Sequence, residues 1–195
     1  MLSLNKPLIL ASNSPRRKQL LNKAGFTFAV EVLPTDETYP ENLLPGEIAG
    51  YISHRKAEMF QGTHGDKLVL TADTVVIKEN HILGKPKDKE DALRMLNLLS
   101  GTTHEVITAV SLLADETITT LSDVALVSFR KLELTEINHY IEQYKPFDKA
   151  GSYGIQEWIG MIGIDKIEGS FYSIMGLPVH VVYQMLKPYM TRFSK

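Results

Sequence analysis

The stretch LILASNSPRRKQLLNKAG, residues 8–25, decides the fold class because it places a strand, a polar turn and a helix in succession. The apolar run Leu8–Ala11 predicts a short buried strand. Ser14 predicts the N-cap of a helix over residues 15–24, with a proline at its first position and Gly25 as its C-cap. A strand followed directly by a helix is typical of α/β proteins.

Strand and helix patterns continue to alternate along the rest of the chain. Strands are predicted at residues 26–33, 68–77, 81–83, 103–113, 117–129 and 161–167. Helices are predicted at residues 45–61, at 89–99 with Asp88 as cap, from the cap Thr135 to Tyr144, and from Pro178 to the end of the chain. The two long alternating segments joined around Asp115 and Glu116 read as an antiparallel pair. The pattern predicts an α/β fold, a mixed β-sheet flanked by helices.

Length and composition indicate one ordinary globular domain spanning residues 1–195. The chain has 44% hydrophobic and 23% charged residues, and it contains no repeat, low-complexity tract or linker. It has no cysteine, which excludes a disulfide framework, a thiolate metal site and a cysteine nucleophile. The net charge of -2 argues against a nucleic-acid partner, because such proteins carry basic patches.

The chain has no segment that indicates a membrane or secretion. Its apolar runs fall well short of the ~20 residues that span a bilayer, and basic residues follow the first apolar run where a signal peptide would have a cleavage site. We therefore expect a cytoplasmic protein without a membrane partner.

The first candidate site is the start of the predicted helix, with Ser12, Ser14, Arg16 and Arg17. Helix N-termini carry unpaired N–H groups that stabilise anions, and guanidinium groups pair with phosphate oxygens in bidentate fashion. A capped surface helix with solvated arginines fits the same pattern. The motif by itself therefore only suggests a phosphate site.

The second candidate is Asp73, which interrupts the hydrophobic strand TADTVV. Burying a carboxylate is unfavourable unless it is paired, hydrogen-bonded or bound to metal. A strand end that reaches solvent, or an ion pair with a lysine, would explain the presence of Asp73 equally well without a catalytic role. Glu37 in PTDETYP and Lys56 in HRKAE are further charged candidates, although a solvated loop acid and an exposed helical lysine are the simpler interpretations.

The third candidate region combines a lysine turn and a glycine-rich loop. GKPKD places Lys85 on a tight turn, and DKAGSYGIQ ends on Gln156. Glycines permit close backbone approach to a ligand, and a side-chain amide offers a donor and an acceptor that can read a base edge. A turn and a flexible loop without any binding role would be compatible with the same residues.

Taken together and in order, these motifs resemble those of the Maf family over nearly the whole chain. The matching blocks are Ser-x-Ser-x-Arg-Arg at 12–17, Glu37, Lys56, ADT at 72–74, GKP at 84–86, LSGTTHEV at 99–106, DKAGSYGIQ at 148–156 and GLPV at 176–179. The resemblance implies an elongated fold like that of the inosine triphosphate pyrophosphatases, with two lobes around a nucleotide cleft. It also implies a homodimer.

The resemblance further implies hydrolysis of a nucleoside triphosphate to the monophosphate and pyrophosphate. Arg16, Thr74 and Gln156 match the branch that acts on dTTP and UTP, and Ser152 is a small departure from the alanine common there. The implied catalytic residues are Asp73, Glu37, Lys56 and Lys85, with Ser12, Arg16, Arg17, Thr74 and Gln156 binding substrate.

Glu37 and Asp73 are the implied ligands of a divalent metal, Mg²⁺ or Mn²⁺, since hard cations prefer oxygen ligands. Asp73 fits a general base and a metal-bound group that orients the water equally well. Such an enzyme would limit unwanted or modified nucleotides and could be linked to cell-division arrest. The alternative is a regulator of septum formation that binds nucleotide without cutting it, and that has no use for Asp73.

Overall fold

A computed structural model describes residues 2–193. The chain divides into two compact units. The first contains the residues up to Asp73, residues 108–123 and the residues from Gly176 onward, and the second contains residues 74–107 and 124–175. Three long strands therefore contribute residues to both units. No helix among residues 2–193 is long and apolar enough to cross a membrane.

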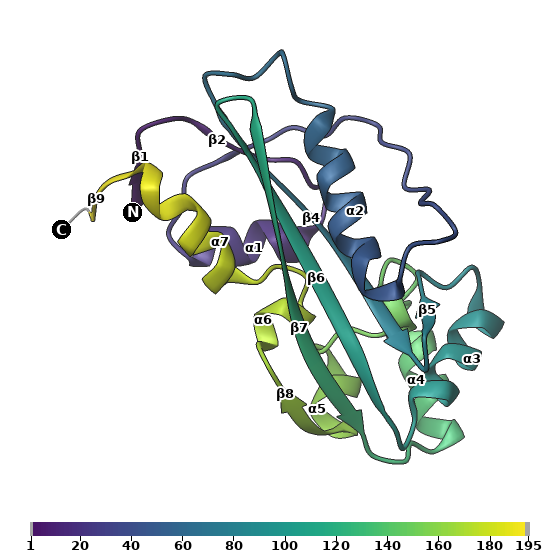
Figure 1. The fold of residues 1–195 in the computed structure, drawn as a ribbon. Coiled ribbons are helices and arrows are strands. Elements are labelled where there is room, and N and C mark those ends of the chain that lie inside the picture. The colour runs from purple at the N-terminus through teal and green to yellow at the C-terminus, as the bar shows by residue number, and fades with distance from the viewer. Residues whose placement is uncertain (1, 194–195) are drawn as a thin grey trace. The chain divides into compact units, whose positions relative to one another are not determined.

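The strands form a mixed sheet, as predicted (Figure 1). In the described residues its order is β3 (Ala29–Val30), β2 (Leu8–Leu10), β4 (Leu68–Lys78), β6 (Thr103–Ala114), β7 (Thr117–Phe129) and β8 (Ile164–Glu168), with β5 (His81–Leu83) also paired to β4. β2 runs parallel to both β3 and β4, whereas β5 and β8 run antiparallel to their neighbours. A separate antiparallel pair joins β1 (Leu2–Leu4) to β9 (Met190–Phe193).

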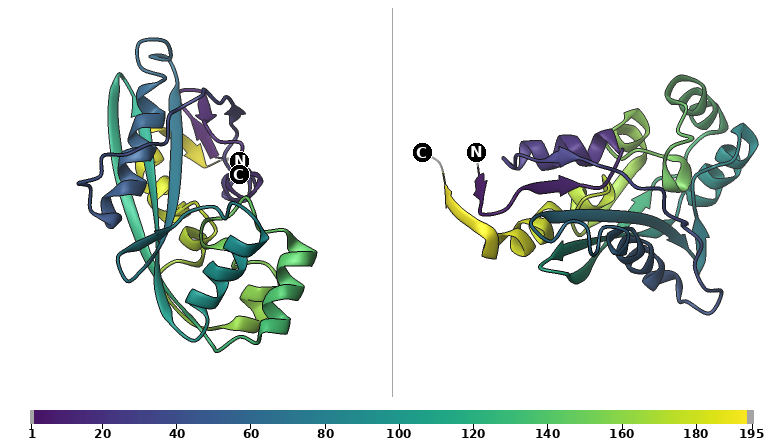
Figure 2. Two further views of the ribbon diagram at one scale, coloured as in Figure 1. Left: turned by 90° about the vertical axis from the view of Figure 1, so that its right-hand side faces the viewer. Right: turned by 90° about the horizontal axis from the view of Figure 1, so that it is seen from above.

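Helices flank this sheet, which confirms the predicted α/β class. They are α1 (Pro15–Lys23), α2 (Pro45–Glu58), α3 (Lys89–Leu99), α4 (Leu134–Tyr144), α5 (Trp158–Gly163), α6 (Phe171–Ile174) and α7 (Val179–Leu186), with 3₁₀ turns η1 (Ala150–Ser152) and η2 (Lys187–Tyr189). Within the second unit, α3 and α4 pack side by side, as the left view of Figure 2 shows.

Several local predictions are confirmed by cap and turn geometry. The Ser14 side chain accepts a hydrogen bond from the backbone N–H of Arg17, as predicted. The C-cap of α1 is Ala24 in place of Gly25, which follows it with φ of +87°. The Asp88 side chain accepts from the N–H of Asp91 at 2.8 Å and so caps α3. The β6–β7 hairpin turns through Asp115 and Glu116, whose φ values of 48° and 61° suit a two-residue turn.

Two predicted boundaries are wrong near the start of the chain. The strand expected at 26–33 is reduced to Ala29–Val30, because its partner β2 has only three residues and pairs with it at two positions. The helix expected at 45–61 ends at Glu58, after which the N–H groups of Phe60 and Gln61 bond three residues back in a tighter turn.

The start of α4 also differs from the prediction. Glu133 is its N-cap in place of Thr135, and the backbone N–H of Glu133 donates to the Glu136 carboxylate at 2.8 Å. A reciprocal acid at the third helical position satisfies an N–H that the helix leaves unpaired. Glu136, three residues after Glu133, is the sequence signal for this cap. The prediction of Thr135 as the cap did not use it.

Two predictions in the last third need correction. The strand expected at 161–167 begins only at Ile164, because residues 158–163 form α5. The final helix does not reach the end of the chain: α7 stops at Leu186, and the described chain ends in β9. Pro188 in the following 3₁₀ turn explains this end, since a proline ring clashes with the preceding helical turn and lacks an N–H.

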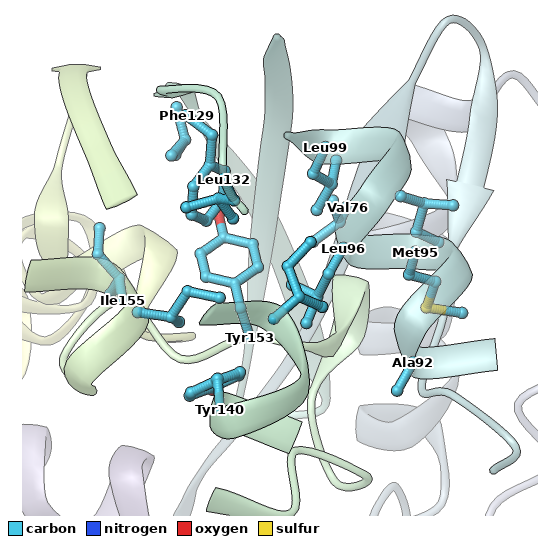
Figure 3. Packing of buried hydrophobic residues seen from close by; sticks show 14 of the residues in the cluster. Val76, Ala92, Met95, Leu96, Leu99, Phe129, Leu132, Tyr140, Tyr153 and Ile155 are labelled. Atoms are coloured by element: carbon cyan, nitrogen blue, oxygen red, sulfur yellow. The ribbon is translucent and has the colours of Figure 1, made fainter. Parts of the chain in front are cut away.

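Each unit has its own hydrophobic cluster. In the first, the strand residues Ile9 and Val69 pack with Ala57 and Phe60 from the α2 region. In the second, α3 contributes Leu96 and Leu99 to a larger cluster that also contains Phe129, Tyr140, Tyr153 and Ile155 (Figure 3). Packing in these clusters fixes the strands and helices that carry the candidate site residues.

Candidate functional site

The turn between β2 and α1 forms the capped start of a helix. β2 ends at Leu10, and the backbone N–H of Ser14 donates to the Ser12 hydroxyl at 3.2 Å. Ser14 in turn caps α1, so that the positive end of this helix begins beside two serines. Arg16 is half-buried on the first turn of α1. The sequence prediction of a capped helix start is confirmed.

Arg17 ties this turn to two other parts of the first unit. Its Nη1 donates to the carbonyl oxygen of Ala72 at 2.8 Å and to the Ser12 hydroxyl at 3.3 Å, and its Nε donates to the carbonyl oxygen of Gly176 at 2.8 Å. Burial lowers the pKa of Arg17 below its usual value, and the negative charge of Asp73 opposes that shift. The guanidinium therefore fixes the strand position next to Asp73.

Asp73, Lys56 and Glu37 form a continuous chain of ion pairs. The Lys56 ammonium lies 2.8 Å from Oδ1 of Asp73 and 2.7 Å from Oε1 of Glu37. The side chains of Asp73 and Lys56 are 15% and 16% exposed, whereas that of Glu37 is 53% exposed. The structure thus brings together three residues that lie on a loop, a helix and a strand, and it gives Asp73 the paired environment that a carboxylate in a hydrophobic strand requires.

A buried hydroxyl network sets the position of Lys56 on α2. Ser53, one helical turn before Lys56, is fully buried and bonds the hydroxyls of Thr71 at 3.3 Å and Ser111 at 2.8 Å. The Thr71 hydroxyl also donates to the carbonyl oxygen of Ser53 at 2.7 Å. Thr71 and Asp73 lie two residues apart on β4 and share one face of the strand. The network therefore aligns Lys56 with Asp73.

Glu37 and Asp73 are the two candidate ligands of a divalent metal. No group of three or more His, Asp or Glu side chains suited to a metal occurs within residues 2–193. Magnesium is commonly held by one or two carboxylates together with substrate phosphates, so a two-carboxylate set is compatible with a metal that arrives with the substrate. The residues present therefore fit such an ion.

In the second unit, the lysine turn lies beside the glycine-rich loop. The N–H of Gly151 donates to the carbonyl oxygen of Gly84 at 3.1 Å, and Lys85 is exposed directly after Gly84. Gly151 has φ of +68°, and a Cβ there would lie 3.0 Å from the Val76 side chain. The loop is therefore a packed segment with a defined path, which the simpler interpretation of a flexible loop did not predict.

The predicted site residues are divided between the two units. Ser12, Arg16, Arg17, Glu37, Lys56 and Asp73 belong to the first unit, and Thr74, Lys85 and Gln156 belong to the second. Thr74 directly follows Asp73 on β4 and is partly buried, and Gln156 is exposed. Within the first unit, ion pairs join Glu37, Lys56 and Asp73, and a separate hydrogen bond joins Arg17 to Ser12.

The sequence did not single out Lys149, Glu157 and Tyr140 of the second unit. Lys149 is only 7% exposed, and its ammonium lies 2.6 Å from Oδ1 of Asp148 and 3.2 Å from Oε1 of Glu157. Glu157 also accepts a hydrogen bond from the Tyr140 hydroxyl. The Asp148 and Lys149 pair at the start of the loop was the available signal, but a sequence pattern does not reveal that such a lysine is buried.

A family model described as Maf-like protein matches residues 7–189. A dTTP/UTP pyrophosphatase of Phocaeicola vulgatus is 50% identical over 182 residues, covering 92% of this chain and 94% of that protein. A dTTP/UTP pyrophosphatase of Porphyromonas gingivalis is 47% identical over 186 residues, covering 93% and 94%.

Among solved structures, the Ham1 protein of Staphylococcus aureus is similar with a TM-score of 0.45 and 15% identity, covering 64% of this chain and 72% of that one. The family model and the curated relatives, in contrast, span nearly the whole chain, and they show that the chain belongs to the Maf family.

Proposed function

We propose that this protein hydrolyses dTTP and UTP to the nucleoside monophosphate and pyrophosphate. The observation that carries the proposal is the Glu37–Lys56–Asp73 ion chain, in a chain that is 50% identical to a protein named dTTP/UTP pyrophosphatase. A partly buried carboxylate held in a defined position by an ammonium group is suited to acid–base work. No observation favours the alternative of a regulator that binds nucleotide without cutting it.

In the proposed reaction, the oxygen of a water molecule forms a bond to the α-phosphorus. The bond between that phosphorus and the oxygen leading to the β-phosphate breaks, and pyrophosphate leaves. Asp73 takes the proton of the water or holds the water in line for attack, since either role requires an ionised carboxylate beside it. Lys56 holds Asp73 in place and adds positive charge.

Charge neutralisation carries most of such a reaction because the transition state spreads negative charge over phosphate oxygens. We assign this role to Lys56 and Lys85, with Ser12, Arg16 and Arg17 binding phosphate at the start of α1. The support is the capped helix terminus and the fixed position of Arg17 against Ala72 and Ser12. For recognition of the pyrimidine we assign Arg16, Thr74 and Gln156.

A divalent cation, Mg²⁺ or Mn²⁺, is part of the proposal, with Glu37 and Asp73 as the residues that would hold it. When bound, the ion would neutralise phosphate charge alongside the lysines. The support is the pair of carboxylates joined through Lys56, of which Glu37 is half exposed and accessible to an ion that enters with the substrate.

We further propose that residues 1–195 act as one functional domain, in the cytoplasm and as a homodimer. These parts of the proposal rest on the resemblance to the Maf family, whose model spans residues 7–189. Sedimentation of the purified protein tests the dimer. Removal of unwanted or modified nucleotides, with a link to cell-division arrest, is the corresponding cellular role.

The deciding experiment is a pyrophosphate-release screen of the purified protein over common and modified nucleoside triphosphates, with and without divalent metal. We expect dTTP and UTP to be cut well and purine triphosphates poorly. Stoichiometric nucleotide binding without release of pyrophosphate would support the regulator instead.

A further inference from the structure

Gln156 lies between two residues that the second unit holds firmly. Its own side chain is exposed, whereas Ile155 before it is 5% exposed and belongs to the hydrophobic cluster. Glu157 after it accepts a hydrogen bond from the Tyr140 hydroxyl through Oε2 and forms an ion pair with Lys149 through Oε1. The backbone at Gln156 is therefore fixed on both sides.

Tyr140 of α4 connects the two ends of this segment. Its hydroxyl accepts a hydrogen bond from the N–H of Gly154 at 3.0 Å and donates to Oε2 of Glu157. Tyr140 is fully buried, and Figure 3 shows it in the same hydrophobic cluster as Tyr153 and Ile155. Burial raises the pKa of Tyr140, and the hydrogen bond to Glu157 raises it further, so the hydroxyl keeps its proton and remains a donor.

Two further contacts leave this segment little room to move. The buried Lys149 ammonium lies 3.2 Å from Oε1 of Glu157, on the oxygen that Tyr140 does not use. The Glu157 carboxyl group packs over Gly154, where a Cβ would lie 2.8 Å from the carboxyl carbon. A Cβ on Gly160 would lie 2.0 Å from the carbonyl oxygen of Ile155. The segment can therefore follow one path.

We propose that Tyr140 and Glu157 are positioning residues for base recognition. Together they hold residues 154–157 so that the Gln156 amide meets the pyrimidine edge in one orientation. This inference rests on the proposed function, because it assigns a purpose to Gln156 only if the protein selects a pyrimidine. Neither residue has to touch the nucleotide, since their effect passes through the backbone on each side of Gln156.

The test compares dTTP with dCTP. Thymine has a 4-carbonyl and an N3–H where cytosine has an amino group and a bare ring nitrogen, and thymine also carries a 5-methyl group. Tyr140→Phe keeps the ring but leaves the Gly154 N–H and a Glu157 oxygen without their partner. We expect the ratio of kcat/KM for dTTP over dCTP to fall about tenfold, since a misplaced hydrogen-bonding group discriminates poorly. The fall should come through KM, with kcat for dTTP changed less than about twofold.

Tyr144→Phe is the matched control, because Tyr144 lies one turn further along α4 and its ring stacks on that of Tyr140 at a centroid distance of 5.1 Å. It removes a tyrosine hydroxyl from the same helix and should leave the ratio unchanged. Hydrogen exchange gives a second measurement, in which the Gly154 amide should exchange faster in Tyr140→Phe and not in the control. Glu157→Gln, which removes the charge facing Lys149, should lower the ratio as well.

The outcomes separate the two proposals. A wild-type protein that does not prefer dTTP to dCTP contradicts the proposed function, and the inference falls with it. If the wild type prefers dTTP and both Tyr140→Phe and Glu157→Gln keep that preference, the inference is wrong, whereas the proposed function stands. If Tyr140→Phe does not fold, the ratio measured for Glu157→Gln decides.

Discussion

The Lys56 ammonium lies 2.8 Å from Oδ1 of Asp73, although the two residues come from a helix and a strand that are 17 positions apart in the chain. This contact places a positive group beside the carboxylate that interrupts the strand. Because the same ammonium also lies 2.7 Å from Oε1 of Glu37, the carboxylates are joined through one cation.

Asp73→Asn tests the proposed role of the carboxylate. The amide keeps the size and a hydrogen-bond acceptor but removes the charge, so we expect kcat for dTTP to fall by at least the ~10²-fold typical of lost acid–base help. Asp66→Asn, at an exposed position just before β4, is the control and should keep wild-type turnover. Thermal unfolding should show that both variants fold. Near-normal turnover of Asp73→Asn would remove Asp73 from the mechanism.

Removal of metal tests the pair of carboxylates. We expect activity to vanish in EDTA and to return with Mg²⁺ or Mn²⁺, because carboxylate and phosphate oxygens complete the octahedral shell that these ions prefer. Glu37→Gln should need a higher metal concentration for half-maximal activity, and Glu41→Gln in the same exposed loop should not. Full activity in the chelator would exclude Glu37 as a metal ligand.

Gln156→Ala tests recognition of the base. A side-chain amide can pair with a carbonyl and a ring N–H of the pyrimidine together, and a wrong base leaves those groups unpaired. We expect the variant to lose more of its preference for dTTP and UTP than of its maximal rate, as measured by kcat/KM for dTTP, UTP, dCTP, GTP and 7-methyl-GTP. If 7-methyl-GTP is the best substrate of the wild type, the assignment to the dTTP/UTP branch is wrong.

Stability at low pH depends on Glu136 of α4. Its pKa is lowered from 4.5 to about 2, first by hydrogen bonds from the Arg130 guanidinium at 2.7 and 2.9 Å and then by the backbone N–H of Glu133. Since the pKa is lower in the folded protein, the stabilisation is present above the unfolded pKa and is lost as pH falls towards 2.

The measurement is urea unfolding of wild type and Glu136→Gln between pH 7 and pH 2. We expect the variant to be less stable at neutral pH and the difference to shrink as pH falls below 4.5. Glu142→Gln, on the same helix but in an exposed ion pair with Lys89, is the comparison and should have a smaller effect at neutral pH. A difference that stays constant over the whole range would contradict the role of the Arg130 pair.

Features with a local cause were predictable from the sequence. Ser14 and Asp88 cap helices through their own side chains, and the Asp115–Glu116 turn needs only two residues that tolerate positive φ. The period of the long strands identified β4, β6 and β7, because alternating or continuous apolar runs determine which residues can be buried. The motifs in their order also determined the family, which the comparisons confirmed.

Features that depend on distant partners were decided by the tertiary structure. The length of β3 depends on its short neighbour β2, and residues 161–163, predicted as the start of a strand, belong to the helix α5. The sequence indicated Glu37, Lys56 and Asp73 as separate candidates, but only the fold joins them through one ammonium. The roles of Tyr140 and Glu157 were equally invisible, because burial and hydrogen-bond partners arise from packing between segments far apart in the chain and not from local pattern.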